Sequence, residues 1–257
     1  MHFDKFYSII SIISLTLGLI ISFLLIMNSF LKRVLLQTNK LIENFDINQM
    51  EFKKISPIYL LWKRIFDIAV IALSMPLLLP LIILISIVIK IDSSGPIFYY
   101  QKRCGLNGKF YNRIKFRTMR TDIDYESFNV TPSFLYKLAK DPRVTQVGRF
   151  LRSTDLDQIP GIFNILKGDI SFVGTNDLPE KIYSQISPTI KPEIMEALRH
   201  IKPGLVSLWV VSYDYRKVKN EHLLLYDLVY LNKMSFFFDL AIITRTIIIG
   251  AGLIAGY

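Results

Sequence analysis

The chain contains few of the residues that build disulfides or zinc centres. Its 257 residues include one cysteine, Cys104, and three histidines, His2, His200 and His222, which are far apart in the sequence. A single cysteine excludes an intramolecular disulfide. The scattered histidines do not have the spacing of a zinc-ligand set, so structural zinc is not expected. The sequence also lacks internal repeats and low-complexity segments.

Acidic residues are fewer than basic ones. The 31 lysine and arginine residues outnumber the 21 aspartate and glutamate residues, which gives a formal net charge of +10, and 51% of the residues are hydrophobic. The excess of positive charge predicts an anionic partner: a nucleic acid, anionic lipid headgroups or a phosphorylated substrate. The hydrophobic content indicates a membrane protein, and no aromatic and basic RNA-binding signature is present, so we expect no nucleic acid to bind.

An uncharged run near the N-terminus extends from Phe6 to Leu31. Its 26 residues can cross a hydrocarbon core of about 30 Å as a helix, which predicts a transmembrane segment, with a cleaved signal peptide as the alternative. Several basic residues follow this run and only Lys5 precedes it, so the positive-inside rule places the chain after residue 32 in the cytoplasm. We expect residues 32–60 to be a polar connector.

A second uncharged run covers 22 residues from Ile68 to Ile89. Pro76 and Pro80 interrupt it, and each removes a helical hydrogen bond. Basic residues flank the run on both sides, whereas a full crossing would put one basic flank outside the cytoplasm. These patterns predict a re-entrant, broken helix that enters one leaflet of a bilayer and returns, with an ordinary kinked span as the alternative.

The segment from Arg149 to Gly174 has the pattern of a site. An apolar stripe with helical spacing is formed by Leu156, Ile159, Phe163 and Leu166. The stripe leaves Asp157 and Asn164 on the opposite face, away from the core. Pro160 is tolerated in the first turn of a helix, and Gly168 is a typical end signal. We therefore expect one helix that begins at Asp157 and ends at Gly168.

A carboxylate at a helix start has a particular chemical environment. Asp157 would lie at the positive end of the helix dipole beside unpaired backbone N–H groups, so it should stay ionised and close to any bound phosphate. It could act as a nucleophile, as a metal ligand or only as a cap. The spacing from Thr154 to Asp157 also fits a capping box, which keeps the purely structural role open.

The other elements follow from shorter patterns. Residues 95–119 alternate apolar and polar side chains around Gly105 and Gly108, which predicts two strands joined by a turn. Helices are expected at 192–200, with Pro192 near the first position, at 223–231 and at 236–249. The last of these should lie on the membrane surface or pack on the domain. Residues 208–211 are a short strand candidate.

Taken together, these motifs resemble the bacterial sugar transferases, the monotopic phosphoglycosyl transferases that act on a polyprenol carrier. The resemblance covers about residues 61–257 and depends on several motifs rather than one. They include Lys63 to Asp67, Asp92 to Pro96, Lys115 to Met119, Asp141 to Arg143, the pair Leu156 and Asp157, and Leu166 to Asp169. As a set they are far more specific than any single pattern.

The resemblance implies a reaction and a set of site residues. A sugar-1-phosphate would pass from a UDP-sugar to polyprenyl (undecaprenyl) phosphate through a covalent aspartyl phosphosugar intermediate, with release of UMP, as the first step of surface glycan assembly. Asp157 matches the nucleophile, and Mg²⁺ would be held by Asp157 and Gln158, with Asp155 as a further candidate ligand. The candidates for binding substrate phosphates are Lys115, Arg117, Arg103, Arg143 and Arg152, and those for the nucleotide are Gly174 and Asn176.

The chain departs from the family pattern at the site itself. The family has a Glu after the nucleophile where this chain has Gln158, which keeps the shape and loses the charge. The family sequence Gly-Pro-Arg-Pro is Gly174-Thr175-Asn176-Asp177 here, which removes a cation near the nucleotide. Two other functions therefore stay open: a catalytically silent scaffold or regulator of a glycan pathway, and a metal-dependent glycosyltransferase that uses the Asp155-Leu156-Asp157 pattern and releases UDP.

The expected fold is α+β and mostly helical, and it is associated with a membrane. We expect an N-terminal transmembrane helix and connector at residues 1–60, a re-entrant membrane hairpin at 61–92, and a compact cytosolic catalytic domain with membrane-surface helices at 93–257. The membrane would be the bacterial inner membrane, with the catalytic domain on its cytoplasmic side.

Overall fold

The computed structural model describes residues 18, 22–23, 25–36, 55–121, 141, 143–180, 183–184, 192–212 and 220–255. Most of the predicted N-terminal span at 6–31, and most of the connector at 32–60, lies outside the described residues. Residues 25–36 are helical, and four of their apolar side chains are buried in a cluster with the C-terminal helices: Met27, Leu31, Val34 and Leu35. The C-terminal end of the predicted span therefore packs on the domain.

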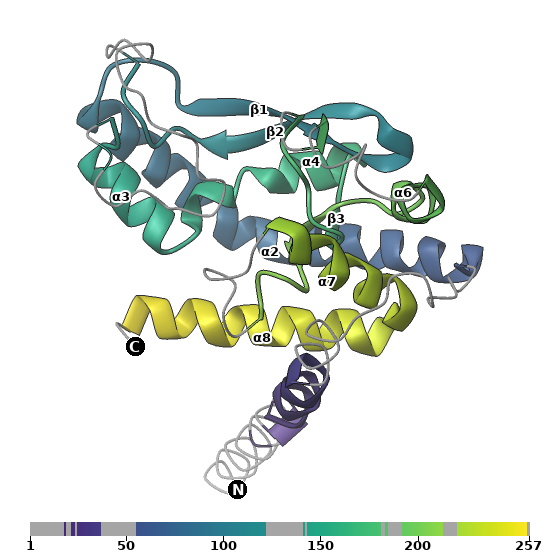
Figure 1. Ribbon diagram of the computed structural model, residues 1–257. Helices are drawn as coiled ribbons and strands as arrows, with labels where there is room; N and C mark the ends of the chain where they lie inside the picture. Colours follow the sequence, from purple (N-terminus) through teal and green to yellow (C-terminus); the bar gives the residue numbers. More distant parts are fainter. Residues whose placement is uncertain are drawn as a thin grey trace, which may run out of the picture.

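The longest element is α2, which extends from Pro57 to Asp92 over 36 residues. Pro57 stands at the start of the helix, where a missing N–H costs no hydrogen bond. The sequence predicted a break at Pro76 and Pro80, but α2 is one continuous helix through both prolines. Figure 1 shows that it bends along its course across the molecule. A proline removes one backbone hydrogen bond and bends a helix, but the hydrogen-bonded turns before and after it can keep the helix continuous.

Along one side, α2 is covered by the domain, and along the other it is exposed. Ile71, Ile82 and Ile85 are buried, whereas Leu73 and Leu77 are 84% and 77% exposed. Among the described residues, α2 is the helix that is long and apolar enough to cross a membrane. Soluble proteins rarely expose a continuous apolar strip of this length, so its outer face fits a lipid environment.

The two strands joined by a turn that were predicted at residues 95–119 are confirmed, and they form a β-hairpin. Strands β1, Phe98–Cys104, and β2, Phe110–Phe116, pair in antiparallel register, with Gln101 opposite Arg113. The turn between them is the short 3₁₀ helix η2, Leu106–Gly108, in which Asn107 and Gly108 have positive φ angles of 56° and 72°. Asn and Gly are the residues that adopt this conformation most easily, which explains why the chain turns here.

The expected single helix from Asp157 to Gly168 is instead built from separate pieces. These are the 3₁₀ turn η3, Leu156–Gln158, and α4, Gly161–Lys167, and a separate helix, α3, Gln146–Ser153, precedes them. The capping box is wrong, because the Thr154 hydroxyl donates to the Phe150 carbonyl 2.8 Å away and thus closes α3. Gly168 ends α4 with a φ of 92°, as its glycine signal predicted.

The face of α4 opposite its apolar stripe is covered by the hairpin. Asn164 is buried there: its Oδ1 accepts from the Ile114 N–H at 2.9 Å and its Nδ2 donates to the Asn112 carbonyl at 2.8 Å. The expectation that this face points away from the core is therefore wrong for Asn164. Polar side chains with satisfied hydrogen bonds can be buried, and hydrophobic periodicity does not detect them.

A second sheet is formed by two short strands that follow the β-hairpin and α4 in the sequence. Strand β3, Ser171–Gly174, pairs in parallel with β4, Gly204–Ser207, and α6, Pro192–Arg199, lies between them in sequence. The prediction of a strand at 208–211 is wrong. The strand that pairs with β3 lies at 204–207, and Leu208 and Val211 are buried in the core in the turn that follows it. An apolar run marks burial, while strand pairing also needs a partner edge.

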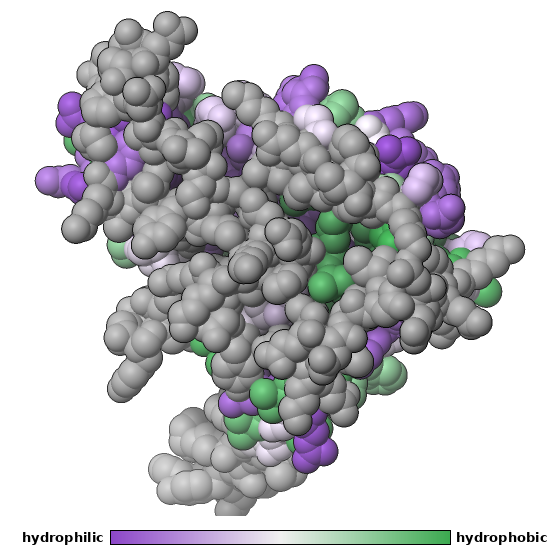
Figure 2. Space-filling model, viewed as in Figure 1, coloured by the Kyte–Doolittle hydropathy of each residue, from purple (hydrophilic) through white to green (hydrophobic). Residues whose placement is uncertain are grey.

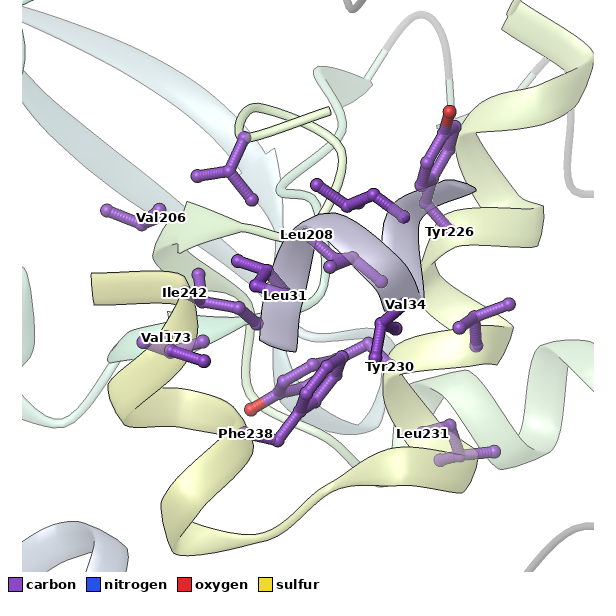
Figure 3. Packing of buried hydrophobic residues seen from close by; sticks show 14 of the residues in the cluster. Leu31, Val34, Val173, Val206, Leu208, Tyr226, Tyr230, Leu231, Phe238 and Ile242 are labelled. Atoms are coloured by element: carbon purple, nitrogen blue, oxygen red, sulfur yellow. The ribbon is translucent and has the colours of Figure 1, made fainter. Parts of the chain in front are cut away.

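Two C-terminal helices complete the domain: α7, Asn220–Lys233, and α8, Phe236–Ala255. Figure 3 shows the main core, in which side chains from α7, α8, both short strands and the N-terminal helical segment meet. Its labelled members include Leu31, Leu208 and Tyr230. A second cluster joins α2 to α3, α4 and β2. In Figure 2, hydrophilic side chains follow the edge where Figure 1 places the hairpin.

Candidate active site

Asp157 lies in a tight turn between two helices. The turn begins at Asp155, whose φ of 58° is left-handed, a conformation that Asp tolerates better than most residues. The Asp155 carboxylate accepts from the Gln158 side-chain amide at 3.2 Å. On its other side, the Gln158 Oε1 lies 3.4 Å from Nη2 of Arg113, which donates to it. Asp155 and Gln158 thus brace the turn on both sides of Asp157.

Strand β2 presents cations to this turn. Arg113 and Lys115 alternate with Ile114, so the two cations project from the same face of the strand. Burial lowers the pKa of Lys115 to about 8, and the nearby Arg103 adds to this, while Asp157 and Asp177 partly oppose it. The structure therefore places Lys115 within electrostatic reach of both Asp157 and Arg103.

Arg152, on α3, is electrostatically coupled to the same carboxylate. Its pKa is lowered by burial, and Asp157 and Asp141 oppose that shift. The Arg152 Nε donates to the Thr118 hydroxyl at 2.7 Å, which fixes the guanidinium at the end of the hairpin. Arg143 stands beside it and donates to both oxygens of Asp141, and these hydrogen bonds hold the pKa of that carboxyl below its usual range.

Arg117 has a different environment from the other candidate cations. Its guanidinium is buried and donates to the backbone carbonyls of Ser93 and Ser94, immediately after α2. Gly95 has a φ of +117°, and a Cβ built there would lie 2.0 Å from the Arg117 Nη1. In this structure Arg117 therefore fastens the end of α2 to the hairpin.

Arg113 and Asp177 are site residues that the sequence analysis did not select. Asp177 lies 3.2 Å from Arg113, and its second contact is the Tyr111 hydroxyl, which donates to it at 2.9 Å. Burial alone would raise the pKa of Asp177, but Arg103, Arg113 and Lys115 outweigh it and lower that pKa. The alternation of Tyr111, Arg113 and Lys115 along β2 was the signal that could have identified Arg113.

Gly174 and Asn176, the predicted nucleotide-binding residues, follow β3. A Cβ at Gly174 would lie 2.4 Å from the Lys202 carbonyl oxygen, so glycine is required for the close approach to β4. The Asn176 N–H donates to Asp227 Oδ1 at 2.8 Å. Asp227 is buried on α7, and burial raises its pKa to about 8.

The oxygen donors near Asp157 limit how a metal could bind. Among the described residues, no group of three His, Cys, Asp or Glu side chains is placed to hold a metal ion. The turn offers two carboxylates, Asp155 and Asp157, and the Gln158 amide. Mg²⁺ is usually held by one or two carboxylates together with substrate phosphates and water, so this donor set fits that type of site.

The fold and site together define a class of protein: a membrane-associated α+β protein with an aspartate turn facing buried cations, suited to a phosphorylated substrate. The comparison with known families is specific. The family model described as bacterial sugar transferase matches residues 58–251, and the chain belongs to that family.

Curated relatives have consistent names. The chain is 33% identical over 212 residues to the galactosyl transferase CpsE of Streptococcus agalactiae, and 32% identical over 212 residues to an undecaprenyl-phosphate glucose phosphotransferase of Komagataeibacter xylinus. These matches cover 79% of this chain and 45% and 38% of the relatives, so the chain spans less than half of their length. It is also 33% identical to the exopolysaccharide production protein ExoY of Rhizobium meliloti, covering 75% of this chain and 87% of ExoY.

Proposed function

We propose that the chain transfers a sugar-1-phosphate from a UDP-sugar to polyprenyl (undecaprenyl) phosphate and releases UMP, as the first step of surface glycan assembly. The observation that carries this proposal is the position of Asp157, in a turn braced by Asp155 and Gln158 and electrostatically coupled to Lys115 and Arg152. The names of the relatives, including the undecaprenyl-phosphate glucose phosphotransferase, support the same reaction.

The chemistry has two balanced steps. An Asp157 carboxylate oxygen attacks the β-phosphorus of the UDP-sugar, the bond from that phosphorus to the bridging oxygen breaks, and UMP leaves with the electron pair. The result is an aspartyl phosphosugar. A phosphate oxygen of the polyprenyl phosphate then attacks the same phosphorus, and the Asp157 carboxylate is regenerated.

The cations around Asp157 would stabilise the charge that develops during both steps. Lys115, Arg113 and Arg152 come from rigid elements, β2 and α3, so they need little reorganisation when the phosphates bind. Mg²⁺, held by Asp157 and Gln158 with Asp155 as a further ligand, would neutralise part of the diphosphate charge. Gln158 keeps Asp157 oriented through its contacts with Asp155 and Arg113.

The geometry of α2 supports a re-entrant position in the inner membrane. At its beginning, Arg64 donates to the Ile165 and Leu166 carbonyls at 2.5 and 2.9 Å, at the end of α4. At its other end, the Arg117 guanidinium donates hydrogen bonds to the carbonyls of Ser93 and Ser94. Since both ends of α2 contact one domain, both fit the cytoplasmic side, and the exposed apolar face between them fits a single leaflet. A topology reporter attached after Asp92 tests this, and periplasmic exposure would contradict it.

The assay for the reaction uses the full-length protein in lipid nanodiscs with Mg²⁺, undecaprenyl phosphate and a panel of UDP-sugars. We expect UMP release that Asp157→Asn abolishes and that Asp155→Asn reduces only partly, because Asn also adopts the left-handed conformation. Without the acceptor lipid, intact-protein mass spectrometry should show one added sugar phosphate in the wild type and none in Asp157→Asn.

The alternative functions give different products. A folded protein that releases no nucleotide from any UDP-sugar would favour the scaffold or regulator, for which the loss of charge at Gln158 is the supporting observation. UDP as the product would favour the metal-dependent glycosyltransferase.

A further inference from the structure

Two cations lie close together at the end of α4, near the start of α2. Arg64, on α2, and Lys202, in the loop before β4, both approach Gly168. A Cβ built at Gly168 would lie 3.7 Å from the Arg64 Nη2 and 3.7 Å from the Lys202 Nζ, so these two nitrogens are no farther apart than twice that distance. The proposed function assigns no role to these residues, which we call the Arg64–Lys202 pair.

Neither member of the pair is neutralised by a carboxylate in contact with it. Within the part of the chain that the structure describes, Arg64 and Lys202 form no ion pair. The preceding residue, Lys63, differs in this respect, because it pairs with Asp239. The Arg64–Lys202 pair is therefore a local excess of positive charge at the surface of the domain.

Both cations also keep hydrogen-bond donors available. Arg64 uses two of its N–H groups on the carbonyls of Ile165 and Leu166, at the end of α4. A guanidinium has five N–H groups, so others remain for a ligand. The Lys202 ammonium donates to none of the described residues. The carbonyls at the end of α4 are thus served by Arg64, and Lys202 adds a charge that they do not use.

The two positive charges disfavour each other. Burial lowers the pKa of Lys202, and the charge of Arg64 adds to this, while Asp67 and Asp169 partly oppose it. Both oxygens of the Asp67 carboxylate already accept hydrogen bonds from other groups. A like charge nearby disfavours the charged form of a lysine, and an anion between the two cations would remove that penalty.

The pair lies at the depth expected for lipid headgroups. Arg64 stands just before the uncharged run that begins at Ile68. Aromatic side chains gather at the same end of α2: Trp62 is exposed, and Phe66 packs edge-to-face against Phe236 of α8 with ring centroids 5.6 Å apart. Aromatic residues are enriched where a membrane meets water, so this end of α2 fits the interface rather than the hydrocarbon core.

An apolar strip begins beside the pair. It is formed by Leu61, Ile65 and Ile68, which are all exposed. Their spacing of four and three residues places them on one face of α2, and Arg64 borders that face. A phospholipid can therefore place its phosphate at the pair and its acyl chains along the strip, whereas a free phosphate ion would contact the pair alone.

We propose that the Arg64–Lys202 pair binds the phosphate of an anionic membrane phospholipid, whose acyl chains lie along the apolar strip. The arginine fork and the lysine ammonium can hold different oxygens of one phosphate, and Gly168 leaves the space between them open. This site is distinct from the turn that carries Asp157. The two lie at opposite ends of α4, and the seven residues of that helix rise about 10 Å.

The first test is direct lipid binding. A short-chain phosphatidylglycerol is titrated into the full-length protein in detergent, and bound lipid is counted by native mass spectrometry. We expect Lys202→Gln to weaken phosphatidylglycerol binding about tenfold. Lys167→Gln is the matched control, because it removes the same charge from an exposed lysine at the same end of α4, and it should bind lipid like the wild type.

Two results of this titration would overturn the proposal. Wild-type affinity in Lys202→Gln would show that the lysine does not hold the phosphate. Equal losses in Lys202→Gln and Lys167→Gln would show a diffuse attraction to charge instead of a built site. The Tm of Lys202→Gln should equal that of the wild type in nanodiscs of phosphatidylcholine. A lower Tm together with unchanged lipid binding would mean that Lys202 only supports the end of α4.

Three ligands distinguish the possible sources of the phosphate. Lys202→Gln should weaken phosphatidylglycerol and leave the binding of undecaprenyl phosphate unchanged, and Asp157→Asn should leave phosphatidylglycerol unchanged. If Lys202→Gln weakened undecaprenyl phosphate alone, the pair would belong to the acceptor lipid and the proposal would be wrong. Inorganic phosphate that bound as tightly as phosphatidylglycerol, and equally depended on Lys202, would make this a site for a free ion.

A substitution at Gly168 tests the excess charge itself. Residue 168 has a φ of 92°, and Asp and Asn both tolerate this left-handed conformation. Either side chain would occupy the place of the phosphate, so both variants should lose phosphatidylglycerol binding. In nanodiscs of phosphatidylcholine, Gly168→Asp should have a Tm roughly 2 °C or more above that of Gly168→Asn, because only the carboxylate neutralises the pair. Equal Tm values would contradict the proposal.

The outcomes are independent of the proposed function, since lipid binding is measured without a UDP-sugar. Phosphatidylglycerol binding that requires Lys202, in a protein that releases no UMP, would support the lipid site and contradict the reaction. UMP release by a protein whose phosphatidylglycerol binding does not depend on Lys202 would do the reverse.

Discussion

Arg113 and Asp177 form a buried ion pair whose nitrogen and oxygen lie 3.2 Å apart, with the Arg113 side chain 1% exposed. The other terminal nitrogen of Arg113 donates to Gln158. One guanidinium therefore joins the turn that carries Asp157 to the loop after β3. A planar group with five donors suits this bridging position, and a lysine would not.

Replacement of Arg113 should destabilise the protein strongly. In Arg113→Met the buried Asp177 loses a partner, and breaking a buried pair costs about 3 kcal/mol or more. For a chain of this size that corresponds to a fall in Tm of roughly 6 to 12 °C. The control is Lys167→Met, since the Lys167 side chain is 75% exposed and lies 3.7 Å from Asp169. Thermal unfolding in nanodiscs should show almost no change in Tm for Lys167→Met. Equal falls in Tm for Arg113→Met and Lys167→Met would contradict the role of the buried pair.

The pKa of Lys115 predicts an alkaline limit on activity. Below pH 8 the ammonium group is charged and can bind phosphate, and as the pH rises through about 8 it loses its proton in the free enzyme. We therefore expect kcat/KM to fall above pH 8, and kcat to fall at higher pH because bound phosphate stabilises the charged form.

Lys115→Arg is the matched variant for this pH effect. An arginine stays protonated throughout the accessible range, so the alkaline fall in kcat/KM should disappear even if the maximum is lower. The measurement is initial UMP release between pH 6 and 10. If kcat/KM of Lys115→Arg still falls above pH 8, the group that titrates is not Lys115.

Local patterns predicted the parts of the fold that depend on neighbouring residues. The hairpin followed from alternation around Gly105 and Gly108, and the end of α4 at Gly168 followed from glycine chemistry. The division of the Asp157 region into η3 and α4 was missed, because hydrophobic spacing does not distinguish a 3₁₀ turn from the first turn of an α-helix. The strand at 204–207 was also missed, because it is selected by its partner β3.

The site was predictable only where each residue matched a motif. Asp157, Lys115 and Arg152 could be selected one by one, and the structure brings them together. The pairs between Arg113 and Asp177 and between Asn176 and Asp227 join residues 64 and 51 positions apart in sequence, and no local period links them. Contacts of this kind are set by the packing of whole elements, which a single sequence does not display.

Gln158→Glu should change the requirement for magnesium. A carboxylate at this position adds negative charge beside Asp157, so half-maximal UMP release should need roughly tenfold less Mg²⁺. The same substitution removes the amide that donates to Asp155 and places two carboxylates close together. The double variant Asp155→Asn, Gln158→Glu restores a donor to that contact, and its comparison with Asp155→Asn alone isolates the effect of residue 158 on the metal. An unchanged Mg²⁺ titration in the double variant would exclude residue 158 as a ligand.

Gly95 and Gly168 offer a matched pair for testing how the end of α2 is held. Both have positive φ, so alanine should cost more than about 1 kcal/mol of backbone strain at either position. At Gly168 a Cβ would meet only the flexible ends of Arg64 and Lys202 at 3.7 Å, whereas at Gly95 it would displace the Arg117 guanidinium from Ser93 and Ser94. Gly95→Ala should therefore lower Tm by roughly twice the shift of Gly168→Ala or more. It should also reduce UMP release, because Arg117 fastens the β-hairpin that carries Lys115 to α2. Equal losses of stability in the two variants would mean that Arg117 does not hold the end of α2.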